Sequence, residues 1–295
     1  MFARYILPLT CLLASAAQAG AAEPRVIQPV TPWAVALDDD RCRISRVFGE
    51  GEDRTLIYLE QLQPAASFTW VIAGSPVEKL RPANRSLPFD PEVRFGSASA
   101  PVPAMRYYDS TLGDYGASIE GSYPDVTRSD PDLPAGVDQT GDDRVSLSLE
   151  DGARMEWIEL SRRDSYRFAT GSLAPAFENL NLCMRMLGAR WGVDVATTVV
   201  RPEVKNLGEV ARYIQQHYPA KALGRGQQAT LAVRLVIGAG GEIENCTMID
   251  VSQATNFDGT ACEAYEKHAE FTPARDAGGR GVKSVYVNKI VYQVR

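Results

Sequence analysis

Residues that could perform catalysis are few in this chain, and their spacing fits no common catalytic motif. The sequence contains two histidines, His217 and His268, and neither belongs to an H-E-x-x-H zinc motif. It also lacks the G-x-S-x-G turn that presents the serine of many hydrolases. We therefore predict that the protein is not an enzyme and has no cofactor and no metal ion. A hydrolase-type enzyme in the N-terminal part is the alternative, because two separated carboxylates can meet in a folded chain.

Three short clusters could hold a ligand, but turns explain them better. Asp38-Asp39-Asp40 and Asp142-Asp143 lack the regularly spaced oxygen ligands of a calcium-binding loop. Gly238-Ala239-Gly240-Gly241 lacks the third glycine of a dinucleotide-binding fingerprint, and a strand pattern follows it instead of a helix. We interpret all three clusters as turns.

The first residues predict export. Arg4 gives a positive start, residues 5–17 are almost wholly apolar, and Ala17-Gln18-Ala19 matches an A-x-A cleavage signal. The apolar run contains Pro8 and is shorter than the roughly 18 residues that cross a bilayer. We expect a cleaved signal peptide over residues 1–19, a periplasmic location and no transmembrane anchor.

Four cysteines remain once Cys11, inside the apolar run, is set aside. Because an exported protein folds in an oxidising compartment, an even number of cysteines predicts two disulfides. Four cysteines allow three pairings, and the domain division described below favours Cys42 with Cys183 and Cys246 with Cys262. Buried free thiols are the alternative.

The charge balance disfavours nucleic acid as a partner. The formal net charge is −6, and no stretch of the chain is dense in Lys and Arg. A protein that binds phosphate backbones usually carries a basic patch or stripe. We expect no nucleic-acid binding.

The pattern of apolar residues predicts two folded units, a β-rich N-terminal domain of unknown role over residues 25–200 and a smaller domain over residues 205–295. In the first, residues 33–37, 42–48, 55–62 and 68–73 alternate as short strands, which is typical of a meander. Residues 144–150 and 154–160 resemble a hairpin that turns at Asp151-Gly152. Apolar residues then recur every three to four positions from Leu173 to Leu187, which predicts a helix that closes this domain.

In the second unit the expected order is helix (207–217), strand (229–237), strand (242–251), helix (257–269) and strand (283–294). Ile243 and Met248 can face the same side of their strand only if an extra residue lies between them, so we expect a β-bulge there. The predicted fold class is therefore α+β.

Two motifs in this last segment carry a resemblance. Tyr218-Pro219-Ala220-Lys221-Ala222 is similar to a Y-P-x-x-A opening, and Phe271-Thr272-Pro273-Ala274 is similar to an F-x-P-A signature. Together with the order of elements, they make residues of about 207–295 resemble the TonB/TolA-type C-terminal domain, known from Gram-negative bacteria. The resemblance implies a three-stranded antiparallel sheet with two helices, whose edge strand accepts an extended segment of a partner.

The resemblance also suggests where a partner would bind. The expected partner-binding residues lie on the last strand and at the nearby corner, namely Tyr218, Pro219, Val285, Tyr286, Val287, Ile290 and Tyr292. The expected partner is an envelope protein or an extended peptide segment, such as part of an outer-membrane receptor, with a link to TonB-type transport. A homodimer formed through the same strand is the structural alternative. A TonB energy transducer keeps an uncleaved membrane helix and a proline-rich spacer, and we see neither, so we do not expect this chain to energise transport itself.

Overall fold

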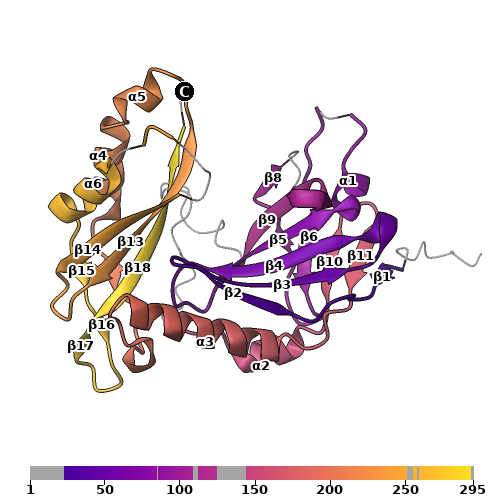
Figure 1. Cartoon of the computed structure of the whole chain (residues 1–295), viewed down its shortest axis with the longest axis horizontal. Coiled ribbons are helices and arrows are strands. Elements are labelled where there is room, and N and C mark those ends of the chain that lie inside the picture. Colours follow the sequence, from indigo (N-terminus) through magenta and orange to yellow (C-terminus); the bar gives the residue numbers. More distant parts are fainter. Residues whose placement is uncertain are drawn as a thin grey trace, which may run out of the picture.

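The computed structural model describes residues 23–84, 86–108, 112–124, 144–250, 255–257 and 259–293. The expected signal peptide and the Asp142-Asp143 cluster lie outside these residues. The described chain forms two lobes, each with its own hydrophobic core, and a third, smaller cluster of buried residues lies between them (Figure 1). The predicted α+β fold class is confirmed.

The N-terminal lobe contains two β-sheets. The larger sheet has six strands in the order β2 (Ala34–Leu37), β3 (Cys42–Phe48), β4 (Thr55–Gln61), β5 (Phe68–Gly74), β9 (Ser118–Tyr123) and β8 (Arg106–Tyr108). The smaller sheet has five, in the order β1 (Arg25–Ile27), β11 (Ser165–Phe168), β10 (Ile158–Ser161), β6 (Glu92–Phe95) and β7 (Val102–Pro103). Strands β2 to β5 pair with their sequence neighbours in antiparallel fashion, which confirms the predicted meander.

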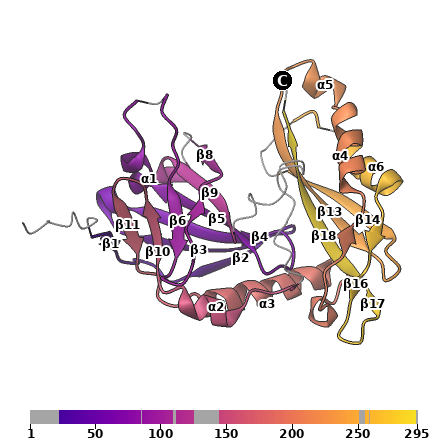
Figure 2. The ribbon, with the colours of Figure 1, turned by 180° about the vertical axis from the view of Figure 1, so that it is seen from behind.

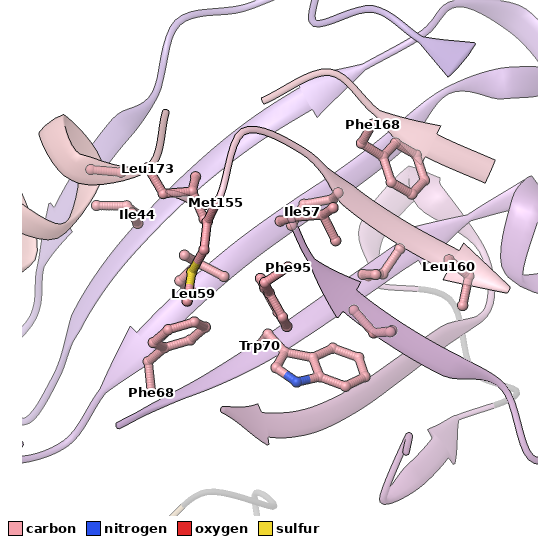
Figure 3. Packing of buried hydrophobic residues seen from close by; sticks show 14 of the residues in the cluster. Ile44, Ile57, Leu59, Phe68, Trp70, Phe95, Met155, Leu160, Phe168 and Leu173 are labelled. Atoms are coloured by element: carbon pink, nitrogen blue, oxygen red, sulfur yellow. The ribbon is translucent and has the colours of Figure 1, made fainter. Parts of the chain in front are cut away.

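The core of this lobe lies between the two sheets. Alternate residues of β4 are fully buried, with Ile57 and Leu59 pointing inward, as the period of two in a strand requires. Figure 3 shows these side chains packed against Phe95 and Phe168 of the smaller sheet. Trp70 lies over Gly121, where an added Cβ would come within 2.2 Å of the indole, so a larger residue would displace the largest side chain of the core.

Helices α2 (Leu149–Arg154) and α3 (Ala174–Arg190) lie together along one side of this lobe, and α1 (Ser75–Leu80) lies apart from them, beside β5 (Figure 1). The 3₁₀ turns span Gly51–Asp53, Gly113–Tyr115 and Val195–Thr197. Helix α3 is the predicted closing helix, and it buries Leu180, Met184 and Leu187. The predicted disulfide between Cys42 of β3 and Cys183 of α3 is confirmed, and it ties the helix to the larger sheet.

The predicted hairpin over residues 144–160 is wrong. The Oγ atom of Ser148 accepts the N–H of Asp151 at 3.1 Å, which is an N-cap, and the expected turn at Asp151-Gly152 lies inside helix α2. Gly152 is buried against α3, where a Cβ would lie 2.8 Å from the Phe177 ring. Strand β10 therefore starts later, at Ile158, and pairs with β6 and β11.

The C-terminal lobe has the predicted order of elements. Its sheet is β14 (Ile243–Asp250), β13 (Ala229–Ile237) and β18 (Ser284–Tyr292), with β13 in the centre and both neighbours antiparallel to it. The helices are α4 (Leu207–Gln216), α5 (Ala220–Leu223) and α6 (Thr260–His268). Two short ribbons complete it, β12 (Glu203–Val204) with β15 (Phe271–Thr272) and β16 (Ala274–Arg275) with β17 (Gly281–Val282).

Strand β14 carries the predicted bulge. Val236 pairs with Asn245 and Ile237 pairs with Ile243, so Glu244 is the extra residue. The turn between β13 and β14 contains Gly238 and Gly241, and the Gly241 N–H donates to the Gly238 carbonyl across it at 3.0 Å. The predicted disulfide between Cys246 of β14 and Cys262 of α6 is also confirmed.

The C-terminal sheet is covered on both faces. Helices α4 and α6 pack on the face that looks away from the N-terminal lobe, as the rear view in Figure 2 also shows. The opposite face packs against residues that follow strand β4 and helix α3. This third cluster consists of Leu62, Val193, Val195, Ala232, Val236, Ile249, Val285 and Val287, with Trp191 beside it. Among the described helices, none is long and apolar enough to cross a membrane.

Candidate partner-binding site

Strand β18 is an edge of the C-terminal sheet. In the described part of the chain it pairs with β13 and with no second strand. The N–H of Val287 points away from β13, because it donates to the side chain of Gln63. Main-chain groups in an antiparallel strand alternate in direction, so the N–H and C=O groups of Lys289 and Val291 point to the same open side. Neither residue has a hydrogen-bond partner on that side among the described residues.

The first half of this edge is covered by the N-terminal lobe. Val285 and Val287 are 6% and 8% exposed and pack in the cluster that contains Leu62. The Oε1 atom of Gln63 accepts the Val287 N–H at 2.7 Å. A partner strand would have to displace these contacts to pair with Val287.

The second half of the edge borders a groove of about 460 Å³ between β18 and helix α4. Leu207, Ala211 and Ile214 of α4 form its apolar wall, and Tyr218 and Leu223 lie at one end. Residues 288–293 of the chain form the opposite wall. The unpaired main-chain groups of β18 and an apolar groove are therefore adjacent.

The residues expected to bind a partner fall into different environments. The side chains of Tyr286, Ile290 and Tyr292 belong to the core of the C-terminal lobe, and Ile290 and Tyr292 also line the groove. Val285 and Val287 lie on the other face, against the N-terminal lobe.

The Tyr218-Pro219 corner supports one end of the groove. The Tyr218 ring meets the Tyr292 ring edge to face, with centroids 5.1 Å apart, and its hydroxyl donates to the Gln227 carbonyl. Burial raises the pKa of Tyr218, so it stays a neutral donor. Pro219 is buried and precedes the first residue of α5. The corner thus fixes the position of Tyr292 at the end of β18.

Several residues that matter at this edge were not expected from the sequence, namely Gln63, Asn288, Lys289, Tyr265 and the residues of α4. Asn288 could have been noticed, because it is a polar residue between Tyr286 and Ile290 on the buried face of the strand. Its Nδ2 atom donates to the Tyr265 hydroxyl at 2.6 Å, and its Oδ1 atom has no partner among the described residues. Burial holds the pKa of Tyr265 far above its usual range, so the hydroxyl is neutral.

Lys289 lies on the face of β18 that looks toward the N-terminal lobe. Burial lowers the pKa of this lysine, and the nearby carboxylates of Glu120 and Glu60 oppose that shift. Arg106 and Arg41 also act on it and lower the pKa further. The ammonium therefore sits where charge is poorly solvated.

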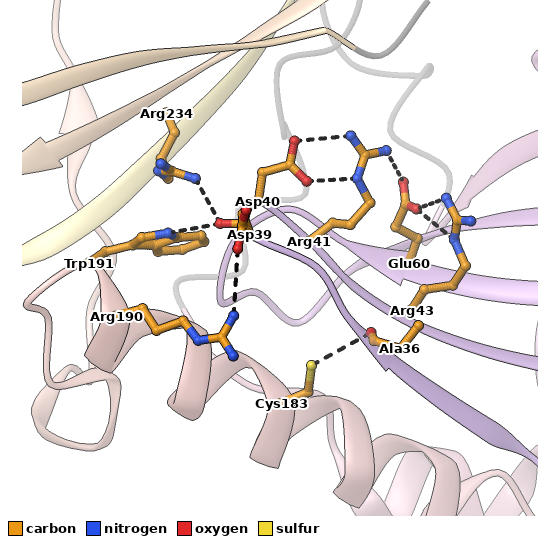
Figure 4. Close-up of polar contacts among 10 residues, drawn as sticks. All are labelled: Ala36, Asp39, Asp40, Arg41, Arg43, Glu60, Cys183, Arg190, Trp191 and Arg234. Atoms are coloured by element: carbon orange, nitrogen blue, oxygen red, sulfur yellow. Dashed lines mark hydrogen bonds and ion pairs between the residues drawn. The ribbon is translucent and has the colours of Figure 1, made fainter.

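Polar contacts hold the two lobes together near the turn between β2 and β3 (Figure 4). The Asp39 carbonyl accepts Trp191 Nε1 at 3.3 Å and Arg234 Nη1 at 3.4 Å. The Arg234 guanidinium also lies over the Trp191 ring, 4.4 Å from its centroid. Asp40 pairs with Arg41. This part of the Asp38-Asp39-Asp40 cluster thus contributes to the contact between the lobes.

The two histidines lie on either side of one tyrosine. The rings of His217 and His268 lie 3.9 Å and 4.4 Å from the ring of Tyr213. His217 Nδ1 is 2.9 Å from the carbonyl oxygen of Tyr213. Among the described residues, no group of three His, Cys, Asp or Glu side chains is arranged to hold a metal ion.

Comparison with known families agrees with the fold of the C-terminal lobe. Residues 214–294 match the family described as the Gram-negative bacterial TonB protein C-terminal, which confirms the resemblance noted from the motifs. No curated protein is significantly similar to the chain. The chain thus contains a TonB C-terminal domain, and a domain of this kind implies a TonB-type interaction role with a protein partner. The domain and the two disulfides are consistent with the cell envelope.

Proposed function

We propose that this chain is a non-catalytic periplasmic protein whose C-terminal domain binds an extended segment of an envelope protein. The segment pairs with residues 289–292 of strand β18 and lies along the groove beside α4. One observation carries the proposal: the outward main-chain groups of Lys289 and Val291 have no partner in the described chain and border an apolar groove.

The physical basis is the unsatisfied edge of a sheet. Unpaired N–H and C=O groups can form a new ladder with another chain, which supplies affinity without depending on side chains. The groove adds apolar surface that an incoming side chain can bury. Since α4 already forms one wall, such a segment would be held on two sides.

The disulfides and the family of the C-terminal domain support the proposed periplasmic location. Two disulfides favour an oxidising compartment, and the C-terminal domain matches the family described as the Gram-negative bacterial TonB protein C-terminal, which is consistent with the cell envelope. An outer-membrane receptor with a periplasmic extended segment is a partner of the proposed kind. The protein would then act alongside TonB-type transport.

Removal of one outward amide tests the proposal. In Val291→Pro the strand loses a main-chain donor on its open side, which an edge strand tolerates. Val291→Thr keeps the amide and nearly the same shape, so it is the matched control. A display library of periplasm-facing segments from envelope proteins would be selected on the unaltered protein, and the selected peptides would then be titrated against both variants.

We expect Val291→Thr to retain the selected peptides and Val291→Pro to lose at least about tenfold in affinity, which corresponds to about one strong main-chain hydrogen bond. Circular dichroism would confirm that both variants are folded. Equal affinity of the two variants would contradict strand addition. A stable dimer in light scattering that Val291→Pro disrupts would instead assign the same edge to self-association.

A further inference from the structure

The two faces of strand β18 carry different kinds of side chain near its open edge. On the face toward the N-terminal lobe, Lys289 lies near Glu60 and Glu120, which belong to the outer surface of the larger sheet. On the other face, the groove is lined by Leu207, Ala211 and Ile214. A strand added to β18 would place alternate side chains on these two faces.

The carboxylates near Lys289 already have cationic partners. Glu60 binds Arg43, with 2.9 Å between Nε and Oε2, and lies 3.7 Å from Arg41. Glu120 lies 3.4 Å from Arg106. The neighbouring Tyr58 remains a neutral phenol, because burial raises its pKa to about 12.

Lys289 itself has no such partner. Across the described ranges, no carboxylate lies within ion-pair distance of its ammonium. The side chain is partly buried on the face of β18 toward the N-terminal lobe. A partly desolvated cation without a counter-ion costs free energy unless a ligand supplies the anion.

Building on the proposed strand addition, we propose that the site selects segments in which acidic and apolar residues alternate. The acidic side chains face Lys289, and the apolar side chains enter the groove beside α4. The proposed partner is therefore a protein segment whose side chains are acidic on one face and apolar on the other.

Cross-strand geometry supports this register. Residues directly opposite each other in a sheet have Cβ atoms about 5 Å apart, within reach of an ion pair. A carboxylate opposite Lys289 or Val291 lies on the lysine face, and the residue between them, opposite Ile290, lies on the groove face. If the added strand shifted by one residue, its acidic side chains would face the groove and its apolar side chains would face Lys289. The alternating pattern therefore selects one register of the added strand.

A second copy of this chain fits the site less well. Its strand β18 would present another Lys289 on the same face, where a carboxylate is needed. Like charges at close range oppose pairing. The charge of the site thus favours a different protein over a homodimer.

Three short fluorescent peptides test the proposal on the full chain. They alternate valine with glutamate, valine with threonine, or valine with lysine, and they would be titrated by anisotropy at low salt. We expect the glutamate peptide to bind about fivefold more tightly than the threonine peptide and more than about tenfold more tightly than the lysine peptide. High salt should reduce these ratios.

Charge reversal at one position provides the decisive comparison. Lys289→Glu should make the lysine peptide the tightest of the three, and Lys289→Gln should bring the three affinities together. An unchanged order of affinities in Lys289→Glu would overturn the proposed charge selection.

The same peptides distinguish this failure from failure of strand addition. If all three bind equally and Val291→Pro abolishes binding, strand addition stands and the charge selection is wrong. If none binds, or if Val291→Pro has no effect on any of them, both proposals are wrong.

Discussion

The side chain of Gln63 accepts the main-chain N–H of Val287 at 2.7 Å, although the two residues lie 224 positions apart in the sequence. A residue of the N-terminal lobe therefore occupies a hydrogen-bonding position on the edge strand of the C-terminal domain. Val287 is buried beside this contact, in the cluster that contains Leu62. The N-terminal lobe thus limits how far along β18 a partner strand can extend.

Loss of the Gln63 amide should loosen this part of the edge. In Gln63→Ala the Val287 N–H has no acceptor, so we expect its hydrogen exchange to accelerate by about tenfold or more, as one hydrogen bond of about 1.5 kcal/mol would produce. NMR-detected exchange would measure this, with Gln215→Ala on the open side of α4 as the control. Equal exchange of Val287 in the two variants would contradict a protecting role for Gln63.

Two helical glycines should respond to alanine in opposite directions. A Cβ at Gly152 of α2 would lie 2.8 Å from the Phe177 ring and 2.9 Å from the main-chain nitrogen of Ala174. Gly152→Ala should therefore destabilise the protein by about 1 to 3 kcal/mol. Gly208 of α4 has nothing within 4 Å of the same position, so Gly208→Ala should stabilise it by about 0.5 to 1 kcal/mol. Urea denaturation would give both values, and a loss of stability in both variants would refute the packing argument.

The buried pair of Tyr265 and Asn288 should show strong coupling. Tyr265→Phe leaves the Asn288 amide without its acceptor, and Asn288→Leu leaves the Tyr265 hydroxyl without its donor. Each change should cost about 1 to 3 kcal/mol, because an unpaired polar group would remain buried. The double variant should cost clearly less than the sum of the two changes, as measured in a double-mutant cycle. Simple additivity would show that the pair contributes no specific interaction.

Lys289 should reduce stability at neutral pH. Its folded-state pKa is lower than the ordinary value of 10.5, so the folded protein holds this proton less tightly than the unfolded chain does. The destabilisation is fully present below the folded-state pKa and disappears as the pH rises toward 10.5.

A methionine at this position retains the length of the side chain without the charge. Lys289→Met should therefore be more stable than the unaltered protein at neutral pH, and this gain should shrink as the pH approaches 10.5. Urea denaturation at the two pH values would test this. A gain that did not depend on pH would indicate better apolar packing in place of relief from a desolvated charge.

The elements whose side chains alternate regularly could be predicted from the sequence. In β4, Ile57 and Leu59 alternate with outward residues, and this pattern fixed both the strand and its buried face. The spacing of Leu180, Met184 and Leu187, three to four residues apart, likewise predicted helix α3 and its buried face. The hairpin prediction failed where local chemistry outweighed the apolar pattern, because the cap at Ser148 starts a helix.

The site was harder to predict, since it depends on contacts between distant parts of the chain. The order of elements placed β18 at the end of the sheet, but no local pattern relates Gln63 to Val287. Likewise, no local pattern shows that Glu60 and Glu120 pair with Arg43 and Arg106, while Lys289 has no carboxylate within ion-pair distance among the described residues. Asn288 is the exception, because a polar residue on a buried strand face can be noticed in the sequence alone.

The bulge at Glu244 makes the two edge strands of the C-terminal sheet, β14 and β18, different from each other. It interrupts the regular spacing of main-chain groups on β14, and the bond from Cys246 to Cys262 anchors this strand to α6. A fibril grows only when each unit offers a flat template on both sides. Since the bulged and anchored β14 offers no such template, copies of this domain are not expected to join β18 to β14 in an open-ended run.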